Sequence, residues 1–137
     1  MASFTYTLSN DLINHITGYA AYTAPTLYIG LSTTTHTVAG TNVTEPSTSG
    51  TGYARQAITG STTWGAAASG SAANAVAVSF STATATWSSG ANMTYSVLFD
   101  SAASGNFLAF GAIAVPQPVV NGNTPSFPIG AVTITFS

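Results

Sequence analysis

The sequence predicts an all-β protein, an antiparallel β-sandwich or jelly roll of about 7–8 strands with one short N-terminal helix. Three observations predict this class. Short segments with strand-like alternation follow Gly18, polar turn clusters separate them, and the stretch before Gly18 has helical spacing instead. The length of 137 residues suits one domain, so we expect residues 1–137 to form a single β-sandwich.

The helix is predicted over residues 9–17. Ser9 or Asn10 can cap its start and Gly18 can end it. We expect the helix to plug one end of the β structure or to dock on a neighbouring copy. Its apolar residues recur at the spacing of one helix face, and they are Leu8, Leu12, Ile13 and Ile16.

Several later segments have the alternation of strands. In the last of them, Val132, Ile134 and Phe136 share one face, which is typical of a half-buried strand. Residues 100–106, with the sequence DSAASGN, predict a hairpin connection. The predicted strands are residues 26–32, 53–59, 75–80, 82–87, 93–100, 106–114 and 131–136.

A long polar segment, residues 33–52, interrupts the strand pattern. Its only large apolar residues are Val38 and Val43, and the rest is rich in Thr, Ser and Gly. Loops of this length are usually functional or disordered. We therefore expect a polar loop or arm that contacts a neighbouring subunit.

Charged residues make up only 3% of the chain, against about a quarter in ordinary soluble domains. Arg55 is the single cation, and Asp11, Glu45 and Asp100 are the acidic residues. Phosphate neutralisation and basic membrane-surface helices both need several cations, so we expect neither nucleic acid nor membrane as a partner. A surface of this kind gives little repulsion between copies, which favours a subunit of a large assembly.

No cysteine is present, which excludes disulfides, thiolate zinc sites and a cysteine nucleophile. The start, MASFTYTLSN, lacks the cationic and apolar regions of a signal peptide, so we expect none. Apolar stretches are all shorter than the roughly 20 residues that span a bilayer. We expect a soluble protein made in the host cytoplasm, with no cofactor and no metal site.

Groups capable of catalysis are few, and we predict no catalytic residue. The chain lacks the G-x-S-x-G elbow of many hydrolases. Glu45 and Asp100, or His36 with a carboxylate, would be needed for a glycan hydrolase, which stays as a minor alternative. Asp11 and His15 are four residues apart, a spacing that suits either a polar pair on a helix or two ligands of an incomplete metal site.

Two sets of residues are candidates for other roles. Arg55 needs a partner if it is buried, and Glu45 is the natural one, so we predict a structural ion pair, with solvent exposure or a subunit-interface role as alternatives. Trp64, Trp87 and Tyr53 are candidate glycan-binding or interface aromatics, because aromatic faces stack on sugars. Core packing explains these rings at least as well, because the predicted strands alternate and give aromatic residues a buried face.

Several segments follow one another in a distinctive order. They are LSNDLINHITG, APTLYIGLSTT, GTNVTEPSTSGTGYARQAITG, NAVAVSFSTATATW, YSVLFDSAASGNFLAFGAI and FPIGAVTITF. In this order the chain resembles, over nearly its whole length, a family of small phage and prophage proteins commonly labelled tail fibre-like or minor tail proteins. The resemblance implies a structural role in the virion of a tailed bacteriophage and no enzyme activity.

The resemblance leaves the place on the particle open. A compact chain without shaft repeats, with few charges and a long polar loop, favours a capsid decoration or cement protein that contacts the major capsid protein or other virion proteins. We expect it to self-associate as a homotrimer or other cyclic oligomer. The alternative is a tail-, neck- or fibre-associated structural protein, or a receptor-binding module for a host-surface glycan.

Overall fold

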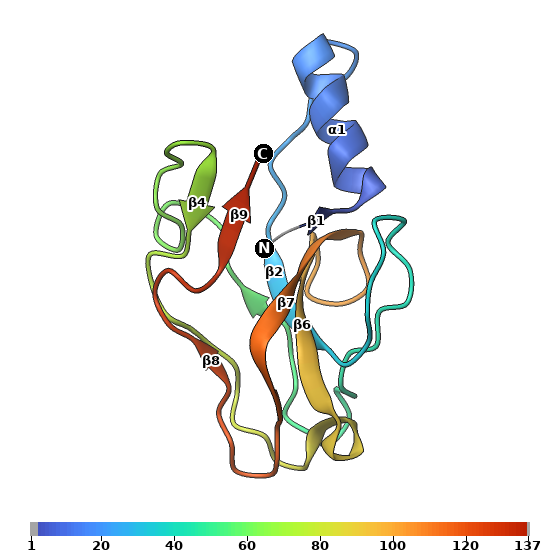
Figure 1. Cartoon of the computed structure of the whole chain (residues 1–137), viewed down its shortest axis with the longest axis vertical. Helices are drawn as coiled ribbons and strands as arrows, with labels where there is room; N and C mark the ends of the chain where they lie inside the picture. Colours follow the sequence, from blue (N-terminus) through green and yellow to red (C-terminus); the bar gives the residue numbers. More distant parts are fainter. Residues whose placement is uncertain (1–2, 137) are drawn as a thin grey trace.

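The computed structural model of the chain describes residues 3–136, and it confirms the all-β class with one short helix (Figure 1). A five-stranded antiparallel sheet and two small two-stranded sheets make up the β structure of this part of the chain. The elements in chain order are β1 (Ser3–Phe4), α1 (Tyr6–Thr17), β2 (Tyr28–Ser32), β3 (Gln56–Ala57), β4 (Ser71–Ala73), β5 (Val78–Ser79), the 3-10 turn Trp87–Gly90, β6 (Asn92–Phe99), β7 (Phe107–Pro118), β8 (Ser126–Phe127) and β9 (Thr133–Thr135).

The hairpin of β6 and β7 forms the middle of the large sheet, whose strand order is β1-β7-β6-β2-β3. Its connection is the predicted turn at residues 100–106, where Ser104 and Gly105 have positive φ angles. The pairing of β6 with β7 shifts register at two places, between Met93 and Tyr95 and between Leu98 and Phe99. Such irregularities bend strands, and β7 curves strongly in Figure 1.

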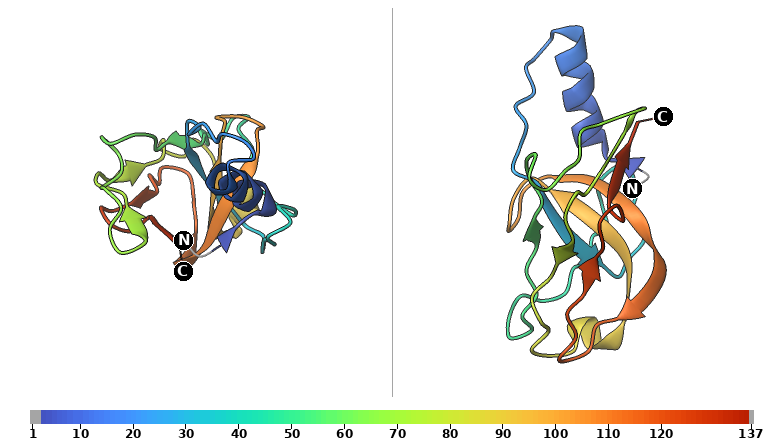
Figure 2. Two further views of the ribbon diagram at one scale, coloured as in Figure 1. Left: turned by 90° about the horizontal axis from the view of Figure 1, so that it is seen from above. Right: turned by 90° about the vertical axis from the view of Figure 1, so that its left-hand side faces the viewer.

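The main core lies between the large sheet and the two small sheets, β4-β9 and β5-β8. Figures 1 and 2 show these small sheets beside one face of the large sheet. The large sheet contributes Ile29, Leu31, Leu98, Leu108 and Ala109, and the facing segments contribute Ile58, Val78, Phe80, Trp87 and Val132. Burial of these side chains supplies the main driving force for folding.

The polar segment 33–52 covers the opposite face of the large sheet. A second buried cluster lies there, formed by Val97, Phe99, Phe107 and Phe110. His36 and Pro46 of the segment are buried, and Val43 packs against this cluster. The segment is therefore not an excursion from the core, because it packs on the apolar face of its own sheet. Its contact with a neighbouring subunit stays a prediction.

The helix begins earlier than the predicted range 9–17, at Tyr6, and ends as predicted at Gly18, which has a φ of 73°. Ser9 and Asn10 are therefore not its caps. The residue at the cap position is Thr5, whose hydroxyl instead donates to the carbonyls of Phe107 and Leu108. Figures 1 and 2 show α1 projecting beyond the β structure, and none of its side chains is buried.

The shortest strands depart most from the sequence prediction. Residues 82–87 form no strand, because the chain there turns Trp87 into the core and enters the 3-10 turn, where Ser88 and Ser89 have positive φ. Residues 53–59 contribute only the two-residue β3. Strands β1, β4 and β8 were not predicted, and each consists of two or three residues paired to a distant partner.

The buried ring of His36 predicts an acid-sensitive stability. It is 6% exposed and makes edge contacts with the rings of Tyr95, Phe107 and Phe110, and neither ring nitrogen has a hydrogen-bond partner in the described residues. Burial lowers the pKa of His36, although the backbone of Asn42 and Thr41 acts in the opposite direction. In the unfolded chain the His36 imidazole becomes protonated near pH 6.5, whereas in the folded chain it becomes protonated only at lower pH.

We therefore expect the free energy of unfolding, measured in urea, to fall as the pH decreases from 7 to 5. His36→Phe should remove most of this fall, since a phenyl ring suits the aromatic surroundings and does not titrate. His15→Gln on the exposed helix is the matched control and should keep it. A wild-type stability that is constant over this range would contradict the assignment.

Candidate functional site

Glu45 and Arg55, the predicted ion pair, lie together at the edge of the sheet face that the segment 33–52 covers. The Nη2 atom of Arg55 is 2.6 Å from Oε2 of Glu45, and Nε is 3.0 Å from Oε1. This two-point geometry matches the planar guanidinium to the carboxylate. The side chains are only 9% and 17% exposed respectively, so each charge depends on the other for compensation.

Further groups complete the environment of Arg55. Its Nη1 atom donates to the carbonyls of Ser101 and Ser104, at 2.9 and 2.7 Å. Its guanidinium carbon lies 3.3 Å from the centre of the Phe99 ring, a cation–π arrangement. The single cation thus joins the segment before β3 to the turn between β6 and β7.

The hydroxyl of Tyr53 extends this network into the large sheet. It donates to Oε1 of Glu45 at 2.6 Å and accepts a hydrogen bond from the backbone N–H of Leu31 at 3.0 Å. Burial, together with the nearby Glu45 carboxylate, raises the pKa of Tyr53 far above its usual range. The strand approaches so closely here that a Cβ atom at Gly30 would lie 2.5 Å from Oε1 of Glu45. The arrangement is that of a rigid structural cluster.

The aromatic residues proposed for glycan binding do not form an exposed platform. Trp87 is fully buried and Tyr53 is 4% exposed, and their rings pack edge to face at 5.0 Å. The indole N–H of Trp87 donates to the carbonyl of Thr51. Trp64 is half-buried against the main core, and its N–H donates to the carbonyl of Ile58. The glycan or interface interpretation of Trp87 and Tyr53 is therefore wrong, since the core already covers both.

Two other titratable groups, Asp100 and His15, serve local structure. Asp100 accepts hydrogen bonds from the backbone and side chain of Asn106, which closes the β6–β7 turn. His15 accepts one from the backbone N–H of Tyr22. Among residues 3–136, no three His, Cys, Asp or Glu side chains come together as a metal site, and no helix is long and apolar enough to cross a membrane.

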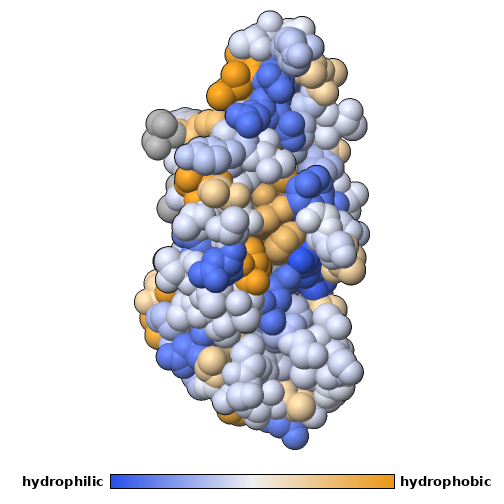
Figure 3. All heavy atoms as spheres, turned by 90° about the vertical axis from the view of Figure 1, so that its right-hand side faces the viewer, coloured by the Kyte–Doolittle hydropathy of each residue, from blue (hydrophilic) through white to orange (hydrophobic). Residues whose placement is uncertain are grey.

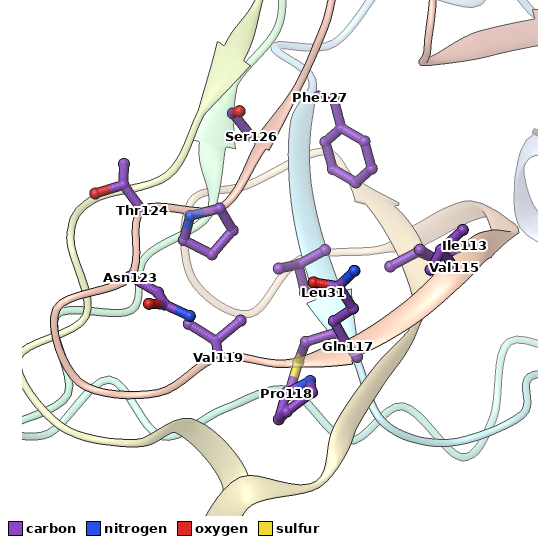
Figure 4. Close-up of a pocket in the computed structure, with 12 residues that line it drawn as sticks. Leu31, Ile113, Val115, Gln117, Pro118, Val119, Asn123, Thr124, Ser126 and Phe127 are labelled. Atoms are coloured by element: carbon purple, nitrogen blue, oxygen red, sulfur yellow. The ribbon is translucent and has the colours of Figure 1, made fainter.

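A hollow beside β7 was not predicted from the sequence. It has a volume of about 380 Å³ and lies between the second half of β7 and the segment that returns into β8 (Figure 4). Leu31, Met93 and Val119 are buried residues at its base. We call it the β7–β8 pocket, and its remaining lining residues are Ile113, Val115, Gln117, Pro118, Asn123, Thr124, Pro125, Ser126 and Phe127.

The polar groups of the β7–β8 pocket are all uncharged. Gln117, Asn123 and Ser126 make no side-chain hydrogen bond within residues 3–136, whereas Thr124 pairs with Thr82. The turn signal at Asn121-Gly122-Asn123 is visible in the sequence, but the direction of these side chains depends on the strand pairing. The pocket can hold a neutral ligand, and it contains no group that could act as an acid or base.

The fold and these sites define a small β-rich protein. Its nearly buried ion pair connects its own loops, and its one helix projects from the β structure. A family model described as podophage GP4 fiber I protein gp80 matches residues 3–135. The chain belongs to this phage fibre protein family, which confirms the resemblance to tail fibre-like virion proteins. The comparison with curated proteins returned no match.

The buried ion pair predicts an asymmetric response to substitution. Arg55→Met leaves the Glu45 carboxylate without its cation and should lower the free energy of unfolding by about 3–5 kcal/mol. The double variant Glu45→Gln/Arg55→Met should recover part of this loss, because no buried charge is left unpaired. Urea titration followed by tryptophan fluorescence measures both values.

Asp11→Asn on α1 is the matched control, a charge change outside the pair that should alter stability by no more than about 0.5 kcal/mol. If Arg55→Met were as mild as this control, the pair would not be an internal support of the fold.

Proposed function

We propose that the chain is a non-enzymatic structural subunit of a tailed-phage virion, at the tail or its fibres, which associates with further copies of itself through α1. Membership of a fibre protein family supports the tail or fibre location better than the capsid decoration or cement role that we expected from composition. The family also supports a virion location and a structural role. Contact with the major capsid protein gains no support.

The observation that carries this proposal is the exposed apolar side of α1. Ile16 is 81% exposed and Ile13 56% exposed, and Tyr19 just beyond the helix is 84% exposed. Figure 3 shows hydrophobic atoms on one side of the projecting end of the molecule, and further hydrophobic patches on a body that is mostly pale or hydrophilic. Large apolar side chains gathered on a projecting helix are typical of an interaction surface.

The helix is amphipathic, and only part of its apolar side is used within the chain. Leu8, Leu12 and Ile16 follow one another at four-residue spacing, which places them along one side. Leu8 and Leu12 line an apolar hollow of about 300 Å³ between α1 and the β body, which Ile134 and Phe136 close from below. Ile16 lies on the same side of the helix but beyond the β body, and no other part of the described chain covers it.

A second copy of the chain is the occupant that suits this surface best. The apolar stripe offers no charge, and α1 carries one formal charge, on Asp11. Identical helices can therefore meet without like-charge repulsion, and no cationic or acidic patch selects a partner of opposite sign. A cyclic arrangement such as a trimer would place the apolar sides around one axis.

Substitution of the exposed isoleucines tests self-association. The double variant Ile13→Ser/Ile16→Ser should shift the protein from oligomer to monomer in size-exclusion chromatography with light scattering, with association at least tenfold weaker. Its circular dichroism and unfolding midpoint should stay close to those of the monomeric fold, because neither side chain contributes to the core.

Ile129→Ser is the matched control, since Ile129 is 69% exposed and lies outside α1. This variant should keep the wild-type oligomer. A wild-type protein that is monomeric at high concentration would overturn self-association. Separately, a cryo-EM map of the particle with density for this chain on the capsid lattice, and none at the tail or fibres, would overturn the proposed location.

A further inference from the structure

The β7–β8 pocket combines three features of a ligand site. Its volume of about 380 Å³ is within the range of roughly 300–1,000 Å³ found for small-molecule sites. Its base is apolar, with Leu31, Met93 and Val119 buried behind it. Its rim carries the unengaged side chains of Gln117, Asn123 and Ser126, and Figure 4 shows Gln117 and Asn123 around the same hollow as the Phe127 ring.

We propose that this pocket binds a neutral saccharide unit. A sugar ring presents hydroxyl groups along its edges and C–H groups on its faces. The primary amides of Gln117 and Asn123 can each donate and accept, which suits neighbouring hydroxyls that also do both. The half-buried ring of Phe127 offers a face for the C–H groups.

Because the pocket lining carries no charge, it favours neutral ligands over charged ones. None of the pocket's residues is ionisable, and the Glu45–Arg55 pair is held on the other face of the sheet. A sialic or uronic acid would lose the hydration of its carboxylate without gaining a cation. A purely apolar ligand would leave the amides of Gln117 and Asn123 unpaired where it covers them. A neutral sugar satisfies both kinds of surface.

The pocket binds its ligand and does not cleave it. Glycoside cleavage requires two carboxyl groups, or an equivalent acid and base, on either side of the glycosidic bond. The pocket lining has neither. The minor alternative of a glycan hydrolase at Glu45, Asp100 or His36 therefore finds no support here, because those side chains are engaged or buried elsewhere.

Saturation-transfer NMR on the full chain tests the proposal, with free galactose, glucose and N-acetylglucosamine as neutral probes and N-acetylneuraminic and glucuronic acids as charged ones. We expect transfer to at least one neutral probe and little to either acid. Gln117→Ala and Asn123→Ala should each weaken binding about fivefold, and the double variant more strongly. Neither side chain bonds within residues 3–136, so the variants should keep wild-type stability.

Asn10→Ala, which removes an exposed amide on α1, is the matched control and should bind as the wild type does. Absence of transfer to every neutral probe, or equal binding by the Gln117→Ala/Asn123→Ala variant, would overturn the proposal. So would a change of oligomeric state in that variant, since the pocket would then be an interface between copies. This test does not depend on self-association through α1, because Ile13→Ser/Ile16→Ser leaves the pocket intact.

Discussion

The folded chain depends on the way in which its single cation is held. Arg55 meets the Glu45 carboxylate at two points, the carbonyls of Ser101 and Ser104, and the face of Phe99. These partners belong to two separate stretches of sequence, and Arg55 itself lies in a third. A guanidinium in this position can exist only when all of them are in place, since each alone would leave a nearly buried charge poorly compensated. The ion pair thus specifies which segments meet.

The same network explains why a polar loop can cover an apolar sheet. Tyr53 connects Glu45 to the backbone of β2. Because Gly30 has no side chain, Oε1 of Glu45 and the hydroxyl oxygen of Tyr53 can lie close to the β2 backbone. Once the loop is fixed at this end, the ring of His36 contacts Phe107 and Phe110, and Val43 packs against the same cluster. Few apolar side chains suffice because the position of the loop is set by hydrogen bonds.

Some of this could be predicted from sequence, and the reasons are local. The β6–β7 hairpin has long strands and a Ser-Gly turn, and Gly18 ends the helix because a left-handed conformation suits glycine. The composition also leaves only three acidic side chains, those of Asp11, Glu45 and Asp100, as possible ion-pair partners of Arg55. The two-residue strands and the burial of Trp87 could not be predicted, because they depend on pairing and packing with residues far along the chain. The positions of the Gln117 and Asn123 amides in the β7–β8 pocket could not be predicted either, since the sequence shows a turn but not where its side chains point.

The use of charge inside the fold determines how the outside behaves. Glu45 and Arg55 cancel each other, which leaves the two carboxylates of Asp11 and Asp100 to account for the net charge of −2. The surface therefore projects only a weak electric field, so dissolved salt has little to screen. Encounters with other molecules are guided by shape and by chance collision and hardly by attraction at a distance. A particle that carries such subunits can keep its contacts unchanged between dilute water and brine.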